Sequence, residues 1–208
     1  MAFIETIPVA QATGAVRELY ERAQAGPGYV PNYAKLFSLR PEVNAAWGAL
    51  RGSIRGHMEP RRYELVTLAA ARALRCAYCA LAHGKVLDDK LLAPGQLEAL
   101  LRSPADAGLT LAEVAVMAFA ERVARDATSV TEAEVRALRE QGLTDAEVFD
   151  VAAAAAARCF FSKLLDALGA EPDAAYAEQL DAALLDPLAM ERPVSTSAVE
   201  RLEGHPPS

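Results

Sequence analysis

The sequence predicts an all-α protein, and three observations support that prediction. Alanine dominates the apolar residues of this 208-residue chain, in which 52% of all residues are hydrophobic. Alanine is the best helix former and a poor strand former. No stretch alternates apolar and polar residues over the length of a strand. Three segments begin with a threonine that is followed three residues later by glutamate, the capping box that starts a helix. These segments are Thr110–Glu113, Thr131–Glu134 and Thr144–Glu147.

Prolines and glycines divide the first half of the chain into five expected helices. The first ends before Gly26, and the second begins at Pro41 with apolar residues spaced by three and four. The third begins at Pro60 and is apolar on nearly every side, which predicts that it is buried. A break at Arg75 precedes the fourth helix. The five expected helices cover residues 13–24, 41–56, 60–74, 76–88 and 91–101.

The second half begins with three helices, one after each threonine cap. Gly169 and Pro172 end the last of the three, and a final helix is expected over residues 174–185. From Asp186 onward, prolines, serines and charged residues replace the apolar spacing.

The chain length fits a single domain. We expect this domain over residues 1–185, with a core at 60–90 that contains two closely spaced cysteines, and a flexible tail rich in proline and serine over residues 186–208. Alanine-rich helices that are apolar all round need more cover than one small domain supplies, so we also expect a homo-oligomer.

Charge and composition exclude several classes of partner. A formal net charge of −7 argues against a nucleic-acid partner, which would need a basic stripe. No window of 18 apolar residues is free of charge, so we expect no membrane span. Residues 1–5 lack the basic and apolar regions of a secretory signal, and three cysteines are too few for a disulfide scaffold. We therefore expect a cytoplasmic protein with reduced thiols.

Chemistry concentrates in a C-x-x-C motif that is followed by a histidine. Cys76 and Cys79 are three residues apart and His83 lies four beyond Cys79, so a helix would place all three on one face. Paired thiols at this spacing can cycle between dithiol and disulfide. His83, one turn from Cys79, can accept its proton or stabilise its thiolate.

Glu64 is an acidic residue in the helix that we expect to be buried. A buried carboxylate is costly unless it is paired, and beside thiols and an imidazole it would serve as a general base. The alternative is a structural ion pair with Arg72 or Arg75, and the sequence leaves both readings open.

Other candidate residues have simpler explanations. The two motif cysteines could be core packing, and Cys159 in its alanine-rich surroundings fits that role better. A zinc site is a further alternative, with ligands from Cys76, Cys79, His83 and Glu64. Structural zinc sites usually take their ligands from two well-separated pairs, so a single C-x-x-C on one helix holds zinc poorly. The remaining candidates are a loop histidine, a tail histidine and a solvated basic patch, namely His57, His205 and the group Arg51, Arg55, Arg61 and Arg62.

The pattern of Glu64, Cys76, Cys79 and His83 resembles the signature of the alkylhydroperoxidase D-like, or carboxymuconolactone decarboxylase-like, superfamily. The C-terminal half resembles the peroxidase-related branch of that superfamily, and the resemblance spans residues 30–176. The matching pieces are Phe119-Ala120, Val130-Thr131, Leu138-Arg139, Gly142-Leu143 and Ala167-Leu168-Gly169.

The resemblance implies an all-α homo-oligomer, commonly a trimer or hexamer, with thiol peroxidase activity and no haem, flavin or metal. It implies a hydroperoxide substrate and an electron donor of the thiol class. Cys79 would then be the peroxidatic cysteine and Cys76 the resolving one, with Glu64 and His83 as a proton relay. A physical argument also favours Cys79, because contact with His83 should lower a thiol pKa more than the helix dipole would at Cys76.

Two positions depart from the superfamily pattern. Tyr78 stands between the cysteines where the best-studied relatives carry a histidine, and Ser162-Lys163 stands where Asn-Arg is expected. The leading hypothesis is a thiol-dependent alkylhydroperoxidase-like enzyme. The alternatives are a general thiol–disulfide reductase or redox sensor, a lactone decarboxylase of the wider superfamily, and an oligomeric scaffold with structural zinc.

Overall fold

The computed structural model describes residues 2–202, and all the regular secondary structure in this range is helical. The all-α prediction is confirmed. A single isolated bridge joins Val30 to Glu200 within the same range. The α-helices are α1 (Gly14–Gln24), α2 (Asn32–Phe37), α3 (Pro41–Arg55), α4 (Pro60–Ala73), α5 (Ala77–Lys90), α6 (Gln96–Arg102), α7 (Leu111–Asp126), α8 (Glu132–Glu140), α9 (Asp145–Ala167), α10 (Ala175–Gln179) and α11 (Ala182–Ala189). Three 3-10 turns are η1 (Val9–Gln11), η2 (Pro104–Asp106) and η3 (Ala127–Ser129).

The three threonine caps form as the sequence predicts. Thr110, Thr131 and Thr144 each accept a hydrogen bond from the backbone N–H three residues later. The glutamate at that position accepts one from the backbone N–H of the threonine in return. These reciprocal bonds satisfy backbone donors at the starts of α7, α8 and α9, where no helical partner exists.

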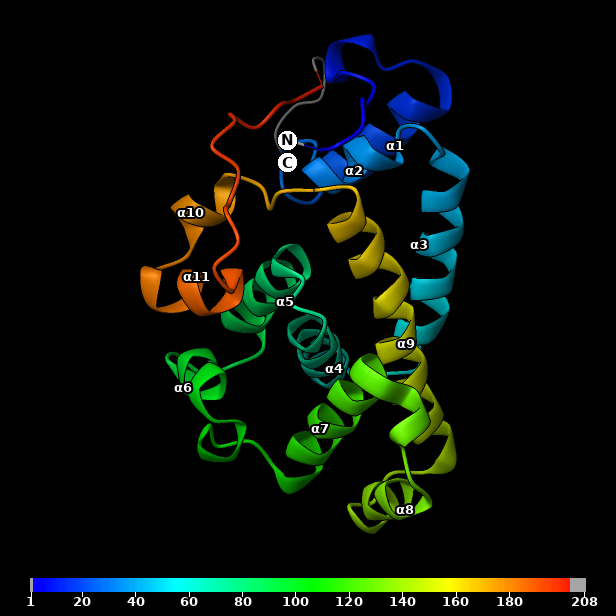
Figure 1. Ribbon diagram of the computed structural model, residues 1–208, viewed down its shortest axis with the longest axis vertical. Helices are drawn as coiled ribbons and strands as arrows, with labels where there is room; N and C mark the ends of the chain where they lie inside the picture. Colours follow the sequence, from blue (N-terminus) through cyan, green and yellow to red (C-terminus); the bar gives the residue numbers. More distant parts are fainter. Residues whose placement is uncertain (1, 203–208) are drawn as a thin grey trace.

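Helix α4 lies at the centre of the fold, where α5, α7 and α9 pack around it (Figure 1). Every residue from Tyr63 to Ala71 is buried, as the apolar character of this helix predicts. Arg75 takes a left-handed conformation with φ 57°, which ends α4 and turns the chain toward α5. The C-x-x-C motif at the start of α5 is thereby placed against the most buried helix.

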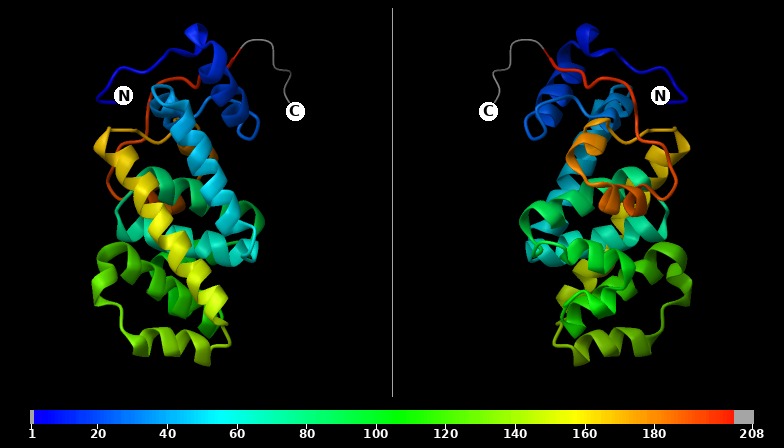
Figure 2. Two further views of the ribbon diagram at one scale, coloured as in Figure 1. Left: turned by 90° about the vertical axis from the view of Figure 1, so that its right-hand side faces the viewer. Right: turned by 90° about the vertical axis from the view of Figure 1, so that its left-hand side faces the viewer.

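Helix α3 packs along α9, and α1 and α2 form a layer over the end of the molecule where the described residues begin and end (Figure 2). The short α2 was not expected, because six residues are too few to show helical spacing. The helix expected over residues 174–185 is two helices, since Leu180 and Asp181 are extended.

The segment after residue 185 differs from the expected flexible tail. Helix α11 crosses that boundary, and Leu188 is fully buried against Gly84 of α5. Further on, the N–H of Ser195 donates to the carbonyl of Pro172. Residues 186–202 therefore pack on the domain, which spacing alone could not show because their contacts are with distant residues. Residues 203–208, with His205, lie outside the described residues.

The surface carries several exposed apolar side chains. Leu111 is 76% exposed and Phe149 is 71% exposed, near the starts of α7 and α9. The expected homo-oligomer would cover such side chains, and it stays a prediction. Between residues 2 and 202, no helix combines the length and the apolar character that a membrane crossing requires.

Candidate active site

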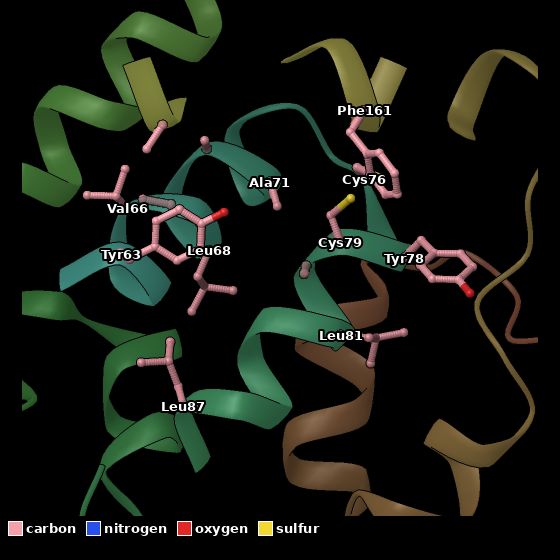
Figure 3. Close-up of a cluster of buried hydrophobic side chains, with 14 of the residues drawn as sticks. Tyr63, Val66, Leu68, Ala71, Cys76, Tyr78, Cys79, Leu81, Leu87 and Phe161 are labelled. Atoms are coloured by element: carbon pink, nitrogen blue, oxygen red, sulfur yellow. The ribbon is translucent and has the colours of Figure 1, made fainter. Parts of the chain in front are cut away.

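The two motif cysteines lie at the start of α5. Cys76 is the N-cap residue and has an extended backbone, so it stands just before the helix on which the sequence analysis placed it. Both side chains are buried and both thiols are free. Figure 3 shows Cys79 extending from α5 toward Cys76 and Phe161. The pair is therefore adjacent, reduced and shielded from bulk solvent.

Glu64 of α4 and His83 of α5 form a close pair, with 2.5 Å between Oε2 and Nδ1. Burial would raise the pKa of Glu64, but the bond to His83 and nearby positive charges hold it below its ordinary value. The expected alternative, an ion pair with Arg72 or Arg75, does not form. Arg72 instead donates to the carbonyl of Leu101, and Arg75 is exposed.

The surroundings of His83 act on the pKa of its imidazole in opposite directions, and the net effect lowers it. Burial lowers its pKa, and the positive charge of Arg158 lowers it further, while the bond to Glu64 opposes both effects. Because Nδ1 is engaged by Glu64, the second ring nitrogen is the one that remains for proton exchange.

Arg158 is the site residue that sequence reasoning missed. This buried side chain on α9 places Nη1 3.7 Å from Sγ of Cys79. Its guanidinium lies 5.6 Å from the ring centres of both Trp47 and Phe161, and its Nε has no hydrogen-bond partner within residues 2–202. A signal was available, since Arg158 is the only charged residue between Val151 and Ser162. A lone charge in so apolar a run needs a partner.

The surroundings of the two thiols separate their pKa values. The interaction with Cys76 lowers the pKa of Cys79 against the effect of burial, and the positive charge of Arg158 lowers it further, with a smaller contribution from His83. The pKa of Cys76 is raised by the same interaction and by burial. These directions favour a thiolate on Cys79, although His83 contributes less to this shift than the sequence argument assumed.

A cavity of about 660 Å³ opens onto these groups. The cavity lining includes three of the four residues singled out in the sequence, namely Glu64, Cys79 and His83. Arg158 lines the same cavity. Cys76 lies behind Cys79, where its sulfur contacts the carbonyl of Ser162 at 3.8 Å. The aromatic residues of the lining are Tyr29, Tyr33, Trp47, Tyr78, Phe161 and Tyr176.

Tyr78, which departs from the superfamily pattern, is anchored in a polar network. Its hydroxyl donates to Oδ2 of Asp173 at 2.5 Å and accepts from the backbone N–H of Tyr33 at 3.2 Å. Oδ1 of Asp173 accepts from the N–H of Asn32 at 2.7 Å. The network ties α5 to α2 and to the segment before α10, so Tyr78 has a positioning role here.

The remaining sequence candidates lie away from the reactive thiols. Cys159 is half-buried and its sulfur contacts the carbonyl of Ala155 at 3.5 Å, in agreement with a packing role. His57 is exposed in the turn after α3. Among residues 2–202, no three histidine, cysteine, aspartate or glutamate side chains are grouped so as to hold a metal ion.

The expected basic patch divides into two pairs with different surroundings. Arg61 pairs with Glu113 and Arg62 pairs with Glu147, so both hold helices together. Arg51 and Arg55 instead line the cavity.

Comparison with known proteins gives consistent similarities. Residues 41–122 match the carboxymuconolactone decarboxylase family. A Mycobacterium tuberculosis protein named alkyl hydroperoxide reductase is 36% identical over 88 residues, which are 40% of this chain and 25% of that protein. The match thus spans about a quarter of that relative's length.

Solved structures show similar folds over most of the chain. An alkylhydroperoxidase AhpD core, a peroxidase-related protein from Ralstonia eutropha, superimposes with a TM-score of 0.75 and 25% identity, covering 84% of this chain and 94% of that one. The debrominase Bmp8 shares the fold with a TM-score of 0.68 and 17% identity, covering 83% of this chain and 91% of its own.

Proposed function

The chain belongs to the alkylhydroperoxidase D-like and carboxymuconolactone decarboxylase-like superfamily, and we propose that it is a thiol-dependent peroxidase that reduces organic hydroperoxides. One observation carries the proposal. Cys79 lines the cavity with the thiol of Cys76 beside it and Nη1 of Arg158 3.7 Å from its sulfur. This arrangement favours a thiolate that an enclosed partner thiol can reach.

In the first step, the Cys79 thiolate attacks the terminal oxygen of the hydroperoxide. A sulfur–oxygen bond forms and the oxygen–oxygen bond breaks, so that Cys79 becomes a sulfenic acid and an alkoxide leaves. Arg158 stabilises negative charge on the sulfur before the attack. The hydroperoxide is reduced by two electrons and the sulfur is oxidised by two.

The leaving alkoxide needs a proton, and we assign its delivery to His83. The imidazole takes the Cys79 proton when the thiolate forms and returns it to the alkoxide, so that an alcohol is released. Glu64 orients the ring through its 2.5 Å bond to Nδ1 and stabilises the imidazolium between these transfers.

In the second step, Cys76 resolves the sulfenic acid. Its sulfur attacks Sγ of Cys79, a disulfide forms, the sulfur–oxygen bond breaks, and hydroxide leaves with the Cys76 proton as water. An external dithiol then reduces the disulfide by exchange and is itself oxidised. Both cysteines are buried, with Cys76 0% exposed and Cys79 2% exposed. This burial disfavours the alternative of a reductase for protein disulfides, which must present a thiol to a bulky partner.

The test is a count of free thiols before and after one equivalent of cumene hydroperoxide. We expect two thiols to be lost per chain, with a disulfide between Cys76 and Cys79 in the digested protein. In Cys76→Ser, a trapping reagent should find sulfenic acid on Cys79. Cys159→Ser is the matched control and should behave as the unsubstituted protein. Unchanged thiols in the presence of the peroxide would overturn the proposal.

A further inference from the structure

We infer that the cavity selects an amphipathic substrate, an organic hydroperoxide whose apolar body carries a carboxylate. The inference rests on the proposed function and adds a substrate class to it. Three features of the cavity support it, namely its charge, its aromatic wall and the face of α3 that borders it.

The charge of the cavity is opposite to that of the chain. Its lining contains the cations Arg51, Arg55, Lys90 and Arg158, but only the two carboxylates Glu64 and Asp173, in a chain of net charge −7. Both carboxylates are already engaged, Glu64 by His83 and Asp173 by Tyr78. The surplus positive charge therefore remains for a ligand.

The outer cations form no salt bridge among the residues that the structure describes, although the charge of Arg55 acts on Glu64 without contact. Arg51, Arg55 and Lys90 are exposed at the cavity and form no salt bridge within residues 2–202, whereas the neighbouring Arg61 and Arg62 are both paired. Arg55 instead lies with its guanidinium 5.8 Å from the ring centre of Tyr63. Guanidinium groups bind carboxylates through two parallel hydrogen bonds, so Arg51 and Arg55 fit a carboxylate at the cavity mouth.

The space between the cations and Cys79 is walled by aromatic rings. Trp47 and Phe161 are stacked with 5.1 Å between ring centres, and Tyr33 meets Phe161 edge-on at 5.6 Å. A volume of about 660 Å³ lies in the range of sites that enclose drug-sized ligands and exceeds the needs of hydrogen peroxide. The peroxide group would lie at Cys79 and the carboxylate at the arginines.

One face of α3 carries both the apolar and the cationic part of this wall. Four residues of this helix lie on one face at helical spacing and line the cavity, namely Trp47, Gly48, Arg51 and Arg55. A Cβ built on Gly48 meets no atom within 4 Å. A larger side chain at Gly48 should therefore enter the cavity without disturbing the helix.

The first experiment compares a fatty-acid hydroperoxide with its methyl ester, which differs only in charge. We expect kcat/KM to be about tenfold higher or more for the acid, as one charge-assisted contact would give. In Arg51→Gln/Arg55→Gln this ratio should fall to near one. Arg136→Gln, which removes an exposed cation of α8 outside the cavity lining, should retain the ratio. Equal turnover of acid and ester by the unsubstituted protein would overturn the inference.

The second experiment needs no turnover. Trp47 is the only tryptophan of the chain and lines the cavity, so its fluorescence should report occupancy. We expect laurate to shift this emission at lower concentration than dodecanol does. Gly48→Leu should abolish the response, while Gly52→Leu, an exposed glycine of the same helix outside the lining, should retain it. Binding of laurate without reduction of any peroxide would overturn the proposed function alone, and an equal response to laurate and dodecanol would overturn the inference alone.

Discussion

Replacement of Arg158 by methionine should raise the pKa of Cys79 and slow its reaction with peroxide at neutral pH. The substitution removes the buried positive charge nearest to the sulfur but retains an unbranched apolar side chain against Trp47 and Phe161. Because Cys79 is only 2% exposed, solvent screens this charge less than it would at the surface.

The size of the expected rise in the pKa of Cys79 follows from the distance of 3.7 Å between Nη1 of Arg158 and Sγ of Cys79. Two unit charges at this separation, with an effective dielectric constant of about 20, attract one another by about 4.5 kcal/mol. This energy corresponds to roughly three pKa units at 1.36 kcal/mol per unit. Arg158 also interacts with the Glu64 carboxylate, which offsets part of its effect on the thiolate. We therefore expect a rise of about one to three pKa units.

The assay measures the rate of alkylation of Cys79 by iodoacetamide as a function of pH. The background is Cys76→Ser/Cys159→Ala, in which Cys79 is the only thiol and a hydroxyl donor remains at position 76. Arg158→Lys should raise the pKa of Cys79 less than Arg158→Met does, because lysine retains the positive charge but lacks the planar guanidinium group. Lys163→Met removes an exposed cation of the same helix and controls for net charge.

An unchanged midpoint of the pH profile in Arg158→Met would refute the reasoning, since the predicted rise depends on the contact between Arg158 and the sulfur of Cys79. An equal rise in Lys163→Met would also refute it, because the effect would then follow net charge and not contact.

Three further predictions concern stability. Thr144→Ala should lower the free energy of unfolding by about 1 kcal/mol in urea titration, because it removes the side chain that caps α9; no change would mean that Glu147 alone satisfies that turn. Tyr78→Phe should lower the free energy of unfolding by about 1–3 kcal/mol, since buried Asp173 loses the hydroxyl that donates to it. An unchanged midpoint of urea unfolding would contradict this prediction. Burial and Arg158 lower the pKa of His83, so the unfolded chain binds that proton more readily; stability should fall as pH drops below about 6.5. The fall in melting temperature should be smaller in His83→Gln, and an equal fall would place the titrating group elsewhere.

Sequence reasoning reached the local part of the site and missed the distant part. Cys79 and His83 share a helix, so a spacing of four residues was enough to predict that they are neighbours. The partner of Glu64 depends on how α4 packs against α5, and the sequence left that choice open. Arg158 and Asp173 approach Cys79 and Tyr78 across 79 and 95 residues of chain. No periodicity connects positions so far apart.

The difference between local signals and distant contacts also explains which parts of the fold the sequence predicted. The capping boxes and the break at Arg75 are properties of a few consecutive residues, and each helix start that they predict is present. The packing of residues 186–202 depends on Gly84 and Pro172, which lie far back in the chain. Their composition resembles that of a loose segment because their order comes from these distant partners.

The bridge between Val30 and Glu200 has a consequence for the order of folding. The N–H of Leu202 donates to the side chain of Gln24 across 178 residues, and Lys35 pairs with Glu200 across 165. Contacts that close such long loops form late, because their entropic cost must be met by structure that already exists. During synthesis, the layer of α1 and α2 therefore lacks these partners until residues 200–202 have left the ribosome. The part of the cavity wall that Tyr29 and Tyr33 supply, between and within these helices, accordingly gains this support only after residue 202 has been made.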